Sequence, residues 1–494
     1  MLKKGMRSMD KNERMRLMGE GNVTVALLRL GMPMVVGMLV TALYNLVDTY
    51  FVSGLGTVSV AAVSVAFPFS LFFVGLGLTF GAGGASLISR LLGAGERRRA
   101  EAVASTALFT AIGVGVLAGA LCLLAVVPVL RLMGATETVL PHARVYAVPF
   151  ILSAVLGVGN VAAGNLAVAQ GAAGTSLAAM TAGAVLNMIL DPIMIYSLGM
   201  GVRGAAAATL ISQAITALLY LRFFAGAGSY LRLSLKNFSP DRKIYGGILS
   251  IGSSVLLLQI LSALSMSLLV RAASAYGDEA VAAVGIVLRI VTLGMFVVFG
   301  FIKGFQPMAG FNYGAGNLAR LDETVRTCLL LSTLFCLAWT AAVLCLSGPV
   351  LSLFSRDTRV LAVAGRALFA NTVLFFSLGL QFTYSTLYLA CGKALEGGFL
   401  SAGRQGIFMI PLLLVLPNLF GLDGVLYAQA GADLLTTLAT LALIRRGRHQ
   451  SALPGPQGPA LRRAAGAPCP GTSGAITGKS LMGTGCNGLR HNGL

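Results

Sequence analysis

Charged side chains are scarce in this chain. Asp, Glu, Lys and Arg make up only 11% of its 494 residues, and 56% of the residues are hydrophobic. A soluble domain carries about 25% charged residues. So little charge leaves no polar shell to cover a globular core of this length, and the composition therefore excludes a soluble protein.

The residues of several common kinds of site are also missing. Three scattered His residues and seven Cys residues without CxxC spacing provide neither a metal cluster nor a disulfide framework. No G-x-x-x-x-G-K-[ST] sequence occurs, so no ATP site is visible. We therefore expect a protein that is not an enzyme and that has no cofactor.

Basic residues outnumber acidic ones, giving a formal net charge of +19. Such an excess is found in nucleic-acid-binding proteins, but here Lys and Arg cluster in short breaks between apolar stretches. No basic face with interleaved aromatic residues appears. We therefore expect no nucleic-acid partner, and assign the charge pattern to membrane topology.

Apolar stretches of about 20 residues or more recur along the chain, which is the length that crosses a bilayer as a helix. They predict an all-α polytopic membrane protein that interacts with the lipid bilayer. Twelve transmembrane helices are expected, at roughly 25–52, 58–81, 103–130, 143–168, 175–198, 204–225, 246–272, 280–303, 324–350, 361–389, 397–418 and 422–444.

The breaks differ in charge on the two sides of the predicted membrane. Basic residues concentrate in residues 1–16, in Arg97–Arg99, between spans six and seven, and after span twelve. An even number of spans places all of these on one side. Because basic loops stay in the cytoplasm, both termini should be cytoplasmic. The first apolar run is too long for a cleavable signal peptide.

The two halves of the chain resemble each other at a constant offset. "LGTVSVAAVSVAF" at Leu55 matches "YGDEAVAAVGIVL" at Tyr276, and "GAGERRR" at Gly93 matches "GAGNLAR" at Gly314 with the same separation. Two pseudo-symmetric six-helix bundles follow, at 25–226 and 246–445, joined by a cytoplasmic linker at 227–245. Residues 1–24 form a cytoplasmic segment, and the Gly- and Pro-rich tail at 446–494 should be disordered.

An even number of spans per repeat keeps both halves in one orientation. Parallel repeats of this kind suit transporters that work by alternating access. A channel or a purely structural membrane protein is the less favoured reading, because neither would need the membrane acids described next.

Acidic residues inside the predicted spans of the first half are rare. Asp48 lies six residues before Gly54, and Asp191 lies eight residues before Gly199. Thr209 lies five residues after Gly204 on the returning span. At ~1.5 Å per residue these positions are roughly 8–12 Å below the outer surface. They should therefore meet at one depth in the outer half of the first bundle.

Further polar residues should join this spot. Asn187 and Asp191 are four residues apart, as are Tyr44 and Asp48, so each pair shares a helix face. Asn45 lies on the same stretch, and Tyr146 lies near the start of the fourth span. These supporting residues complete a predicted site for a coupling ion.

Two prolines bear on this site. Pro192 removes a helical donor and leaves the carbonyl of Met188 free beside Asp191. Pro33 permits a kink in the helix of Asp48, which could be a switch or a static bend.

Carboxylates, an amide, a hydroxyl and a free carbonyl are oxygen ligands that suit Na⁺ or a shared proton. Two carboxylates close together in a low dielectric should not both be ionised. The set Asp48, Asn187, Asp191 and Thr209 is therefore the predicted H⁺ or Na⁺ site, and the sequence does not choose between the two ions.

The second half does not repeat this site. At the offset of the repeat, Leu269, Phe408 and Leu412 stand opposite Asp48, Asn187 and Asp191. The span-seven residue Gln259 is a supporting or substrate-contacting candidate, and Arg289 should have a partner that the sequence does not identify. Other polar residues could line a cavity or join helices: Lys303, Gln306, Asn371, Gln381 and Tyr384.

Several of these segments resemble the multidrug and toxic compound extrusion (MATE) family. "YNLVDTYFVSGLG", "AAVSVAFP" and "GAGERRRAE" resemble its opening signature. "GFIKGFQPMAGFNYGAGNLAR" resembles its signature between spans eight and nine, and "N-x-x-x-D-P" at Asn187 resembles its fifth-span motif. The resemblance covers residues ~25–445.

The resemblance implies a cation-coupled exporter of amphipathic, often cationic, small-molecule drugs. It implies that Asp48 and Asp191 bind the ion, with Asn187 and Thr209 as co-ligands and Tyr146 nearby. A monomer in a bacterial cell membrane is expected. The alternative is a flippase for lipid-linked sugar precursors, in which Arg289 and Lys303 would contact an anionic head group.

Overall fold

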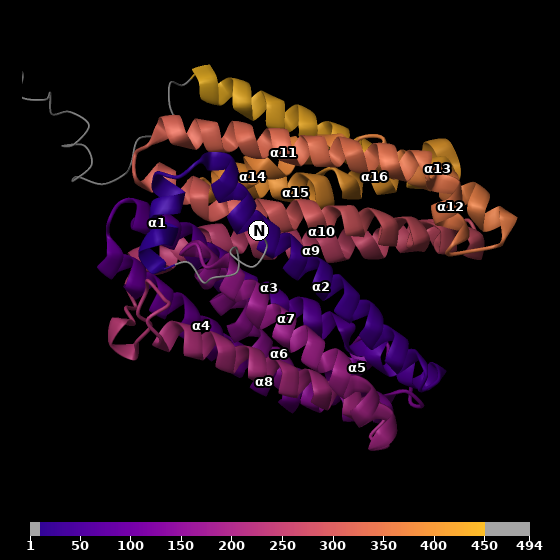
Figure 1. Cartoon of the computed structure of the whole chain (residues 1–494). Coiled ribbons are helices and arrows are strands. Elements are labelled where there is room, and N and C mark those ends of the chain that lie inside the picture. Colours follow the sequence, from indigo (N-terminus) through magenta and orange to yellow (C-terminus); the bar gives the residue numbers. More distant parts are fainter. Residues whose placement is uncertain (1–9, 450–494) are drawn as a thin grey trace, which may run out of the picture. The chain divides into compact units, whose positions relative to one another are not determined.

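The computed structural model describes residues 10–449, with side chains through Arg446. The first half holds a short α1 (Lys11–Gly19) and the long helices that follow it (Figure 1). These are α2 (Val23–Ser53), α3 (Thr57–Gly93), α4 (Arg97–Leu124), α5 (Val126–Leu132), α6 (Leu140–Ala169), α7 (Ala173–Pro192), the π-helical turn η2 (Ile193–Ser197) and α8 (Val202–Ala225).

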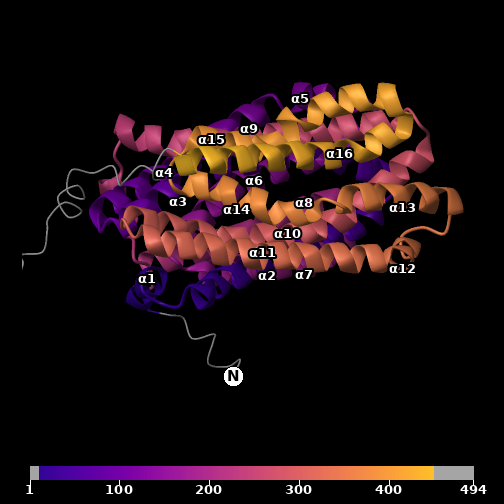
Figure 2. The same cartoon turned by 90° about the horizontal axis from the view of Figure 1, so that it is seen from above.

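The second half begins after a 3₁₀ turn, η3 (Leu235–Asn237), in the linker. In Figure 2 its long helices run roughly alongside one another. They are α9 (Arg242–Ser274), α10 (Asp278–Gly314), α11 (Leu318–Cys345), α12 (Ser347–Ser352), α13 (Thr358–Thr372), η4 (Phe375–Ser377), α14 (Leu378–Ala390), α15 (Ala394–Ala402), the π-helical turn η5 (Gly403–Ile407) and α16 (Met409–His449).

Helix boundaries repeat at the offset seen in the sequence. The helices α3 and α10 have the same length and begin and end at equivalent positions of the repeat, as do α4 and α11. The equivalent turn glycines Gly56 and Gly277 have φ values of 92° and 99°, a region that favours glycine because it has no Cβ. The repeat therefore extends from sequence to backbone conformation.

Eleven helices of the described chain are long and apolar enough to cross a membrane. The last of them, Ala394–Arg446, has 53 residues, about twice the length that one crossing needs. Gly421 breaks it with a φ of 58° and a ψ of −137°. One crossing lies on each side of Gly421, and the predicted layout of twelve spans is confirmed.

Several predicted boundaries were wrong. The spans at 103–130 and 324–350 are each interrupted, at Ala125 and at Leu346, where a short second helix begins. The helices α3 and α10 run on to Gly93 and Gly314, past the predicted ends at 81 and 303, because the helix continues beyond the apolar stretch. Most of the tail predicted to be disordered lies outside the described residues.

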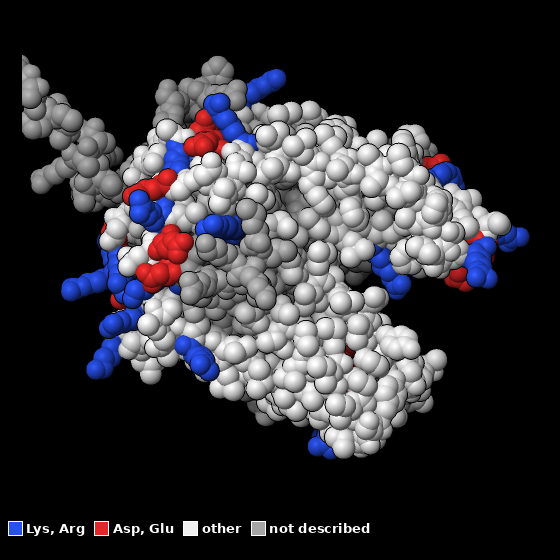
Figure 3. Space-filling view, in the orientation of Figure 1, with Lys and Arg blue, Asp and Glu red and all other residues white. Residues whose placement is uncertain are grey.

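Charged side chains gather on the end of the molecule where α1 lies (Figure 3). A smaller group lies at the opposite end, near α12 and α13, and the surface between them is mostly uncharged. An uncharged band between two charged ends is the pattern of a membrane-embedded helical protein. The same view is hollowed between the two halves on the side away from α1.

The halves contact each other through crossed helix pairs: α2 packs on α10, and α3 packs on α9. Near α1, a Cβ at Gly93 would overlap the carbonyl oxygen of Phe311, and a Cβ at Gly314 would overlap that of Arg90. Only glycine allows such close backbone approach. The two halves are therefore tightly closed at the α1 end.

The short helix α1, which the sequence did not predict, lies across this closed end. Arg14 donates a hydrogen bond to the carbonyl of Gly228 in the linker that follows the first half. The carbonyl of Met18 accepts hydrogen bonds from Asn312 Nδ2 at 3.1 Å and Arg320 Nε at 3.2 Å, both in the second half. The helix thus connects the linker with the second half.

Candidate functional site

A cavity of about 400 Å³ lies among the helices of the first half. Its wall comes mainly from α2, α3, α6, α7 and α8, and α10 contributes Lys303, Gln306 and Pro307 from the second half. Pockets for small organic molecules have volumes of about 300–1,000 Å³ and are largely apolar. The cavity has the size and the mostly apolar lining of such a pocket.

Two carboxylates meet beside this cavity. Asp48 of α2 and Asp191 of α7 lie within hydrogen-bonding contact of each other. Asp191 is fully buried, and its Oδ1 atom receives no hydrogen bond from an N–H or hydroxyl group. In the described residues, neither carboxylate forms an ion pair with a basic side chain. A proton or a cation is needed to relieve this repulsion.

The Asn187 amide fixes one side of the pair. In the amide orientation that satisfies both of its ends, the nitrogen donates to Asp191 Oδ2 at 2.9 Å and the oxygen accepts from the backbone N–H of Thr209 at 3.1 Å. The amide therefore presents a donor, and not an oxygen, to the carboxylates. Among the described residues, no group of three or more His, Cys, Asp or Glu side chains is placed to hold a metal ion.

Two tyrosines enclose the carboxylates. Tyr44 forms a side-chain hydrogen bond with Thr209, whose own hydroxyl donates to the carbonyl of Ala205 at 3.0 Å. Tyr44 is therefore the donor in this bond. Tyr146 is 6% exposed, interacts electrostatically with both carboxyl groups, and stacks on Phe150 with ring centroids 5.2 Å apart. The rings help to exclude water from the carboxylates.

The backbone changes its form directly after Asp191. Helix α7 ends at Pro192, which has no N–H, and the chain continues as the π-helical turn η2. Short π-helical segments occur frequently at functional sites. The sequence Asp191–Pro192 thus places a buried carboxylate where the regular helix ends.

The structure brings together six of the residues expected at one depth: Tyr44, Asp48, Tyr146, Asn187, Asp191 and Thr209. Asn45 is exposed and lines the cavity, and Pro33 lies within α2, which continues through it. Gln259 lies on α9 and is not among the residues that line this cavity.

Of the polar residues noted in the second half, Lys303 and Gln306 line the cavity. Neither side chain forms a hydrogen bond or an ion pair in the described part of the chain. The expected partner of Arg289 is also not found among the described residues: this side chain is exposed and forms no ion pair or hydrogen bond there. A charged side chain within a span was expected to be paired, and here it lies exposed on the surface of the helices instead.

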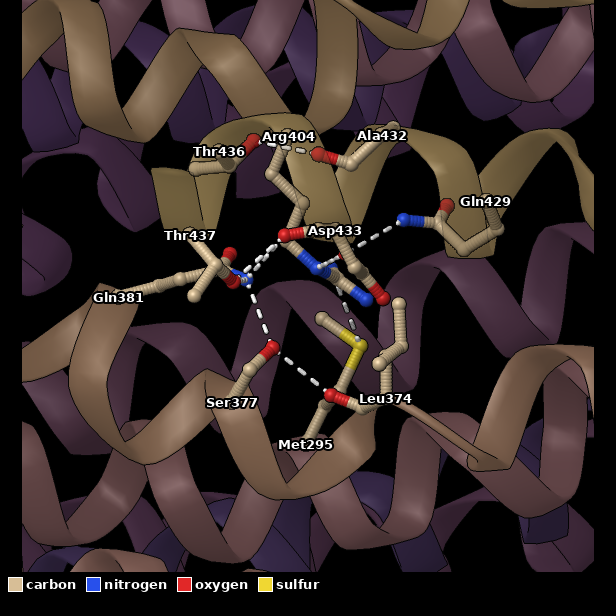
Figure 4. A network of polar contacts seen from close by, with 10 residues as sticks. All are labelled: Met295, Leu374, Ser377, Gln381, Arg404, Gln429, Ala432, Asp433, Thr436 and Thr437. Carbon is tan, nitrogen blue, oxygen red and sulfur yellow. Dashed lines mark hydrogen bonds and ion pairs between the residues drawn. The ribbon is translucent and has the colours of Figure 1, made fainter. Parts of the chain in front are cut away.

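A second polar centre, which the sequence analysis missed, lies in the second half (Figure 4). Arg404 of η5 and Asp433 of α16 form a buried ion pair with an Nε–Oδ1 distance of 2.7 Å and exposed side-chain fractions of 4% and 1%. Gln429 donates to Asp433 Oδ1 at 3.0 Å. Gln381 donates at 3.0 Å to the Asp433 carbonyl, the Ser377 hydroxyl and the Thr437 hydroxyl. Here both charges are paired.

This chain resembles known proteins along most of its length. The model of the MatE family matches residues 33–193 and 252–415. The multidrug export protein MepA of Staphylococcus saprophyticus is 27% identical over 438 residues, which cover 88% of this chain and 96% of that protein. MepA of Staphylococcus aureus is also 27% identical, over 435 residues with the same coverage.

Solved structures with this fold include several MATE transporters. One is described as the outward-facing conformation of a multidrug resistance MATE family transporter, with a TM-score of 0.83, 28% identity, and coverage of 89% of this chain and 98% of that one. A transporter from Pyrococcus furiosus has a TM-score of 0.81 and 28% identity, over 88% of this chain and 97% of its own. The fold is shared over nearly the whole described chain.

Proposed function

This chain belongs to the MatE family, and from that premise we propose that it is a secondary active exporter of amphipathic, often cationic drugs in exchange for protons. The observation that carries the proposal is the contact of the half-buried Asp48 with the buried Asp191, which meet without a basic partner among the described residues. The similarity of this chain to proteins named as multidrug exporters supports the choice of drugs as the substrate.

The geometry favours a proton over Na⁺ as the coupling ion. A Na⁺ site would need several oxygen atoms directed at one point, as other hard cations do. The Asn187 amide instead turns its nitrogen to Asp191 and gives its oxygen to the Thr209 N–H. A single proton shared between two carboxyl groups relieves their repulsion without further ligands.

The coupling site and the cavity share residues. Tyr44, Asn187 and Thr209 line the cavity, and they also hydrogen-bond to one another or to Asp191. Protonation of the carboxylates changes the charge directly behind this wall. A cationic molecule in the cavity is favoured while the pair is ionised and is released when a proton neutralises it.

The charge pattern supports one orientation of the protein in the membrane. The more basic end of the molecule, where α1 lies, is assigned to the cytoplasm of a bacterial cell, with both termini on that side. Asp48 and Asp191 then lie near the outer face, where protons enter. Close packing at the α1 end supports the assignment of this structure to an outward-facing state.

Transport in proteoliposomes tests the proposal. Wild-type protein should move ethidium when a pH gradient is imposed, and Asp48→Asn should reduce this movement to that of liposomes without protein. Asp423→Asn is the matched control, because this carboxylate is half-exposed and pairs with Arg366 away from the site. Equal pH-driven transport by wild type and Asp48→Asn would contradict the proposal, and a requirement for a Na⁺ gradient would replace the proton with Na⁺.

A further inference from the structure

Lys303 lies in the wall of the cavity and has no ion-pair partner in residues 10–446. It lines the cavity together with Gln306, three residues later on the same face of α10. Neither side chain has a hydrogen-bond or ion-pair partner among the described residues. An ammonium group within a membrane-spanning helix is costly unless it is paired or hydrated, so such residues commonly mark a substrate path.

The position of Lys303 excludes two ordinary explanations. At ~1.5 Å per residue, Lys303 lies roughly 16 Å along the axis of α10 from Gly314, where the helix ends. That distance exceeds the length of a lysine side chain, so the ammonium group does not reach the α1 end of this helix. The residue also does not join helices, because no other side chain accepts a hydrogen bond from it in the described structure.

The carboxylates Asp48 and Asp191 do not neutralise Lys303. The neighbouring Gly304 packs against Gly31 of α2, the helix that also carries Asp48. Along that helix, Gly31 and Asp48 are roughly 25 Å apart at ~1.5 Å per residue. At such a distance the attraction between unit charges falls below about 1 kcal/mol in a medium with an effective dielectric constant near 20. The cavity thus has a separate basic region.

Arg289 continues this basic character along α10. At ~100° per residue, Arg289 and Lys303 lie within about 40° of each other around the helix axis, so the two side chains share one face. Arg289 is exposed and has no partner in the described chain. Arg289 does not line the cavity, and it lies roughly 21 Å from Lys303 along the same face of α10.

We propose that Lys303, with Gln306, binds an anionic group of the exported molecule, so that the cavity prefers amphiphiles that carry a carboxylate or phosphate over otherwise identical molecules without one. This inference rests on the proposed export function and narrows its substrate class. The ammonium provides charge and Gln306 provides a neutral donor, and hydrogen bonds to charged groups are the stronger ones. The anion can belong to a free zwitterionic compound or to a lipid head group.

A matched pair of dyes tests the inference by equilibrium binding. Rhodamine 110 is a zwitterion with a free carboxylate, and rhodamine 123 is its methyl ester with the same cationic ring system. Fluorescence anisotropy with the full chain in phosphatidylcholine nanodiscs should show about tenfold tighter binding of rhodamine 110, the value expected for one charged hydrogen bond. Lys303→Met should remove this preference, and Lys303→Arg should keep most of it.

The surface variant Lys236→Met, in an exposed position of the linker, is the matched control and should keep the wild-type preference. Equal binding of the two dyes by the wild type, or an unchanged preference in Lys303→Met, would overturn the inference and leave the export proposal intact. Binding of neither dye would contradict both.

The same assay identifies the source of the anion. Phosphatidylglycerol is added to the nanodiscs in place of part of the phosphatidylcholine. If it weakens rhodamine 110 binding to the wild type but not to Lys303→Met, the anionic group belongs to a lipid head group. If it leaves wild-type binding unchanged, the anionic group belongs to a free compound.

Discussion

The two halves share a backbone but differ in how they treat buried charge. In the first half, Asp48 and Asp191 meet without a cation among the described residues, and one oxygen of Asp191 receives no hydrogen bond. In the second half, Arg404 and Asp433 neutralise each other, and Gln429 completes the contact. The first centre is left with excess negative charge, whereas the second is balanced.

This difference assigns different roles to the two centres. A balanced ion pair within a low-dielectric bundle is retained as it is, because separating its charges is costly. A pair of carboxylates instead takes up a proton or a cation from outside. On the proposed function, the first half therefore binds the coupling ion, and the second half keeps a buried ion pair whose charges balance.

The largest expected effect is on the second centre. Replacing Asp433 with Asn, or Arg404 with Met, leaves one buried charge alone and should destabilise the protein by about 3–5 kcal/mol. Thermal unfolding in detergent should show the loss as a lower melting temperature. The double variant Arg404→Met/Asp433→Leu removes both charges and should regain most of the stability. Unchanged melting of both single variants would remove the contrast between the centres.

A smaller effect is expected on the contact that closes the two halves against each other at the α1 end. A Cβ at Gly314 would overlap the carbonyl oxygen of Arg90, so Gly314→Ala should weaken closure at the α1 end by about 1–3 kcal/mol. An introduced Asn165→Cys in the cavity wall, with the other cysteines replaced by Ser, reports on this closure. The introduced cysteine should react about ten times faster in the Gly314→Ala background with an impermeant thiol reagent that is added on the side of the α1 end.

Gly285→Ala is the control for this variant, because a Cβ at Gly285 of the same helix would meet no atom within 4 Å. It should leave the labelling rate unchanged. A rise of equal size in both glycine variants would show that closure does not depend on the crossing of α3 and α10.

A change next to the carboxylates should have a modest effect. Thr209→Ala removes the hydroxyl that accepts from Tyr44 but keeps the backbone N–H that donates to Asn187. One neutral hydrogen bond is lost, so pH-driven export should fall about fivefold. Initial rates in proteoliposomes measure this, and Thr209→Ser should restore them. Complete loss of export in Thr209→Ala would instead identify the hydroxyl as an ion ligand.

The smallest expected change is in the melting temperature of Asp191→Asn, and its direction distinguishes the two centres. Asp191→Asn removes one of two repelling carboxylates, whereas Asp433→Asn removes the partner of a cation. The first substitution should leave the melting temperature within a few degrees of the wild type, or raise it, where the second lowers it. A melting temperature of Asp191→Asn as low as that of Asp433→Asn would contradict the difference between the two centres.

Much of this architecture could be predicted from the sequence. Apolar length identified the twelve spans, and the internal repeat identified the two halves, because both depend on local and periodic features. The depth of Asp48, Asp191 and Thr209 could be counted from the helix ends at a fixed rise per residue. The orientation of the Asn187 amide toward Asp191 could not be predicted, because it depends on tertiary contacts.

The Arg404–Asp433 pair shows where sequence reasoning stopped. The two residues lie in separate elements, η5 and α16, and nothing in the sequence indicates that they face each other. The useful signal was the presence of two opposite charges within predicted apolar spans. Helix α1 was missed because it is short and polar, and its position depends on contacts with Gly228, Asn312 and Arg320.

The most direct test of the central claim is a measurement of proton release when a cationic substrate binds. Purified protein in a weakly buffered solution with a pH indicator should release about one proton per ethidium bound, because the ionised carboxylate pair favours the cation. The Asp48→Asn/Asp191→Asn variant should release none. Ethidium binding without proton release by the wild type would contradict the account, and equal release by the variant would place the titrating group elsewhere.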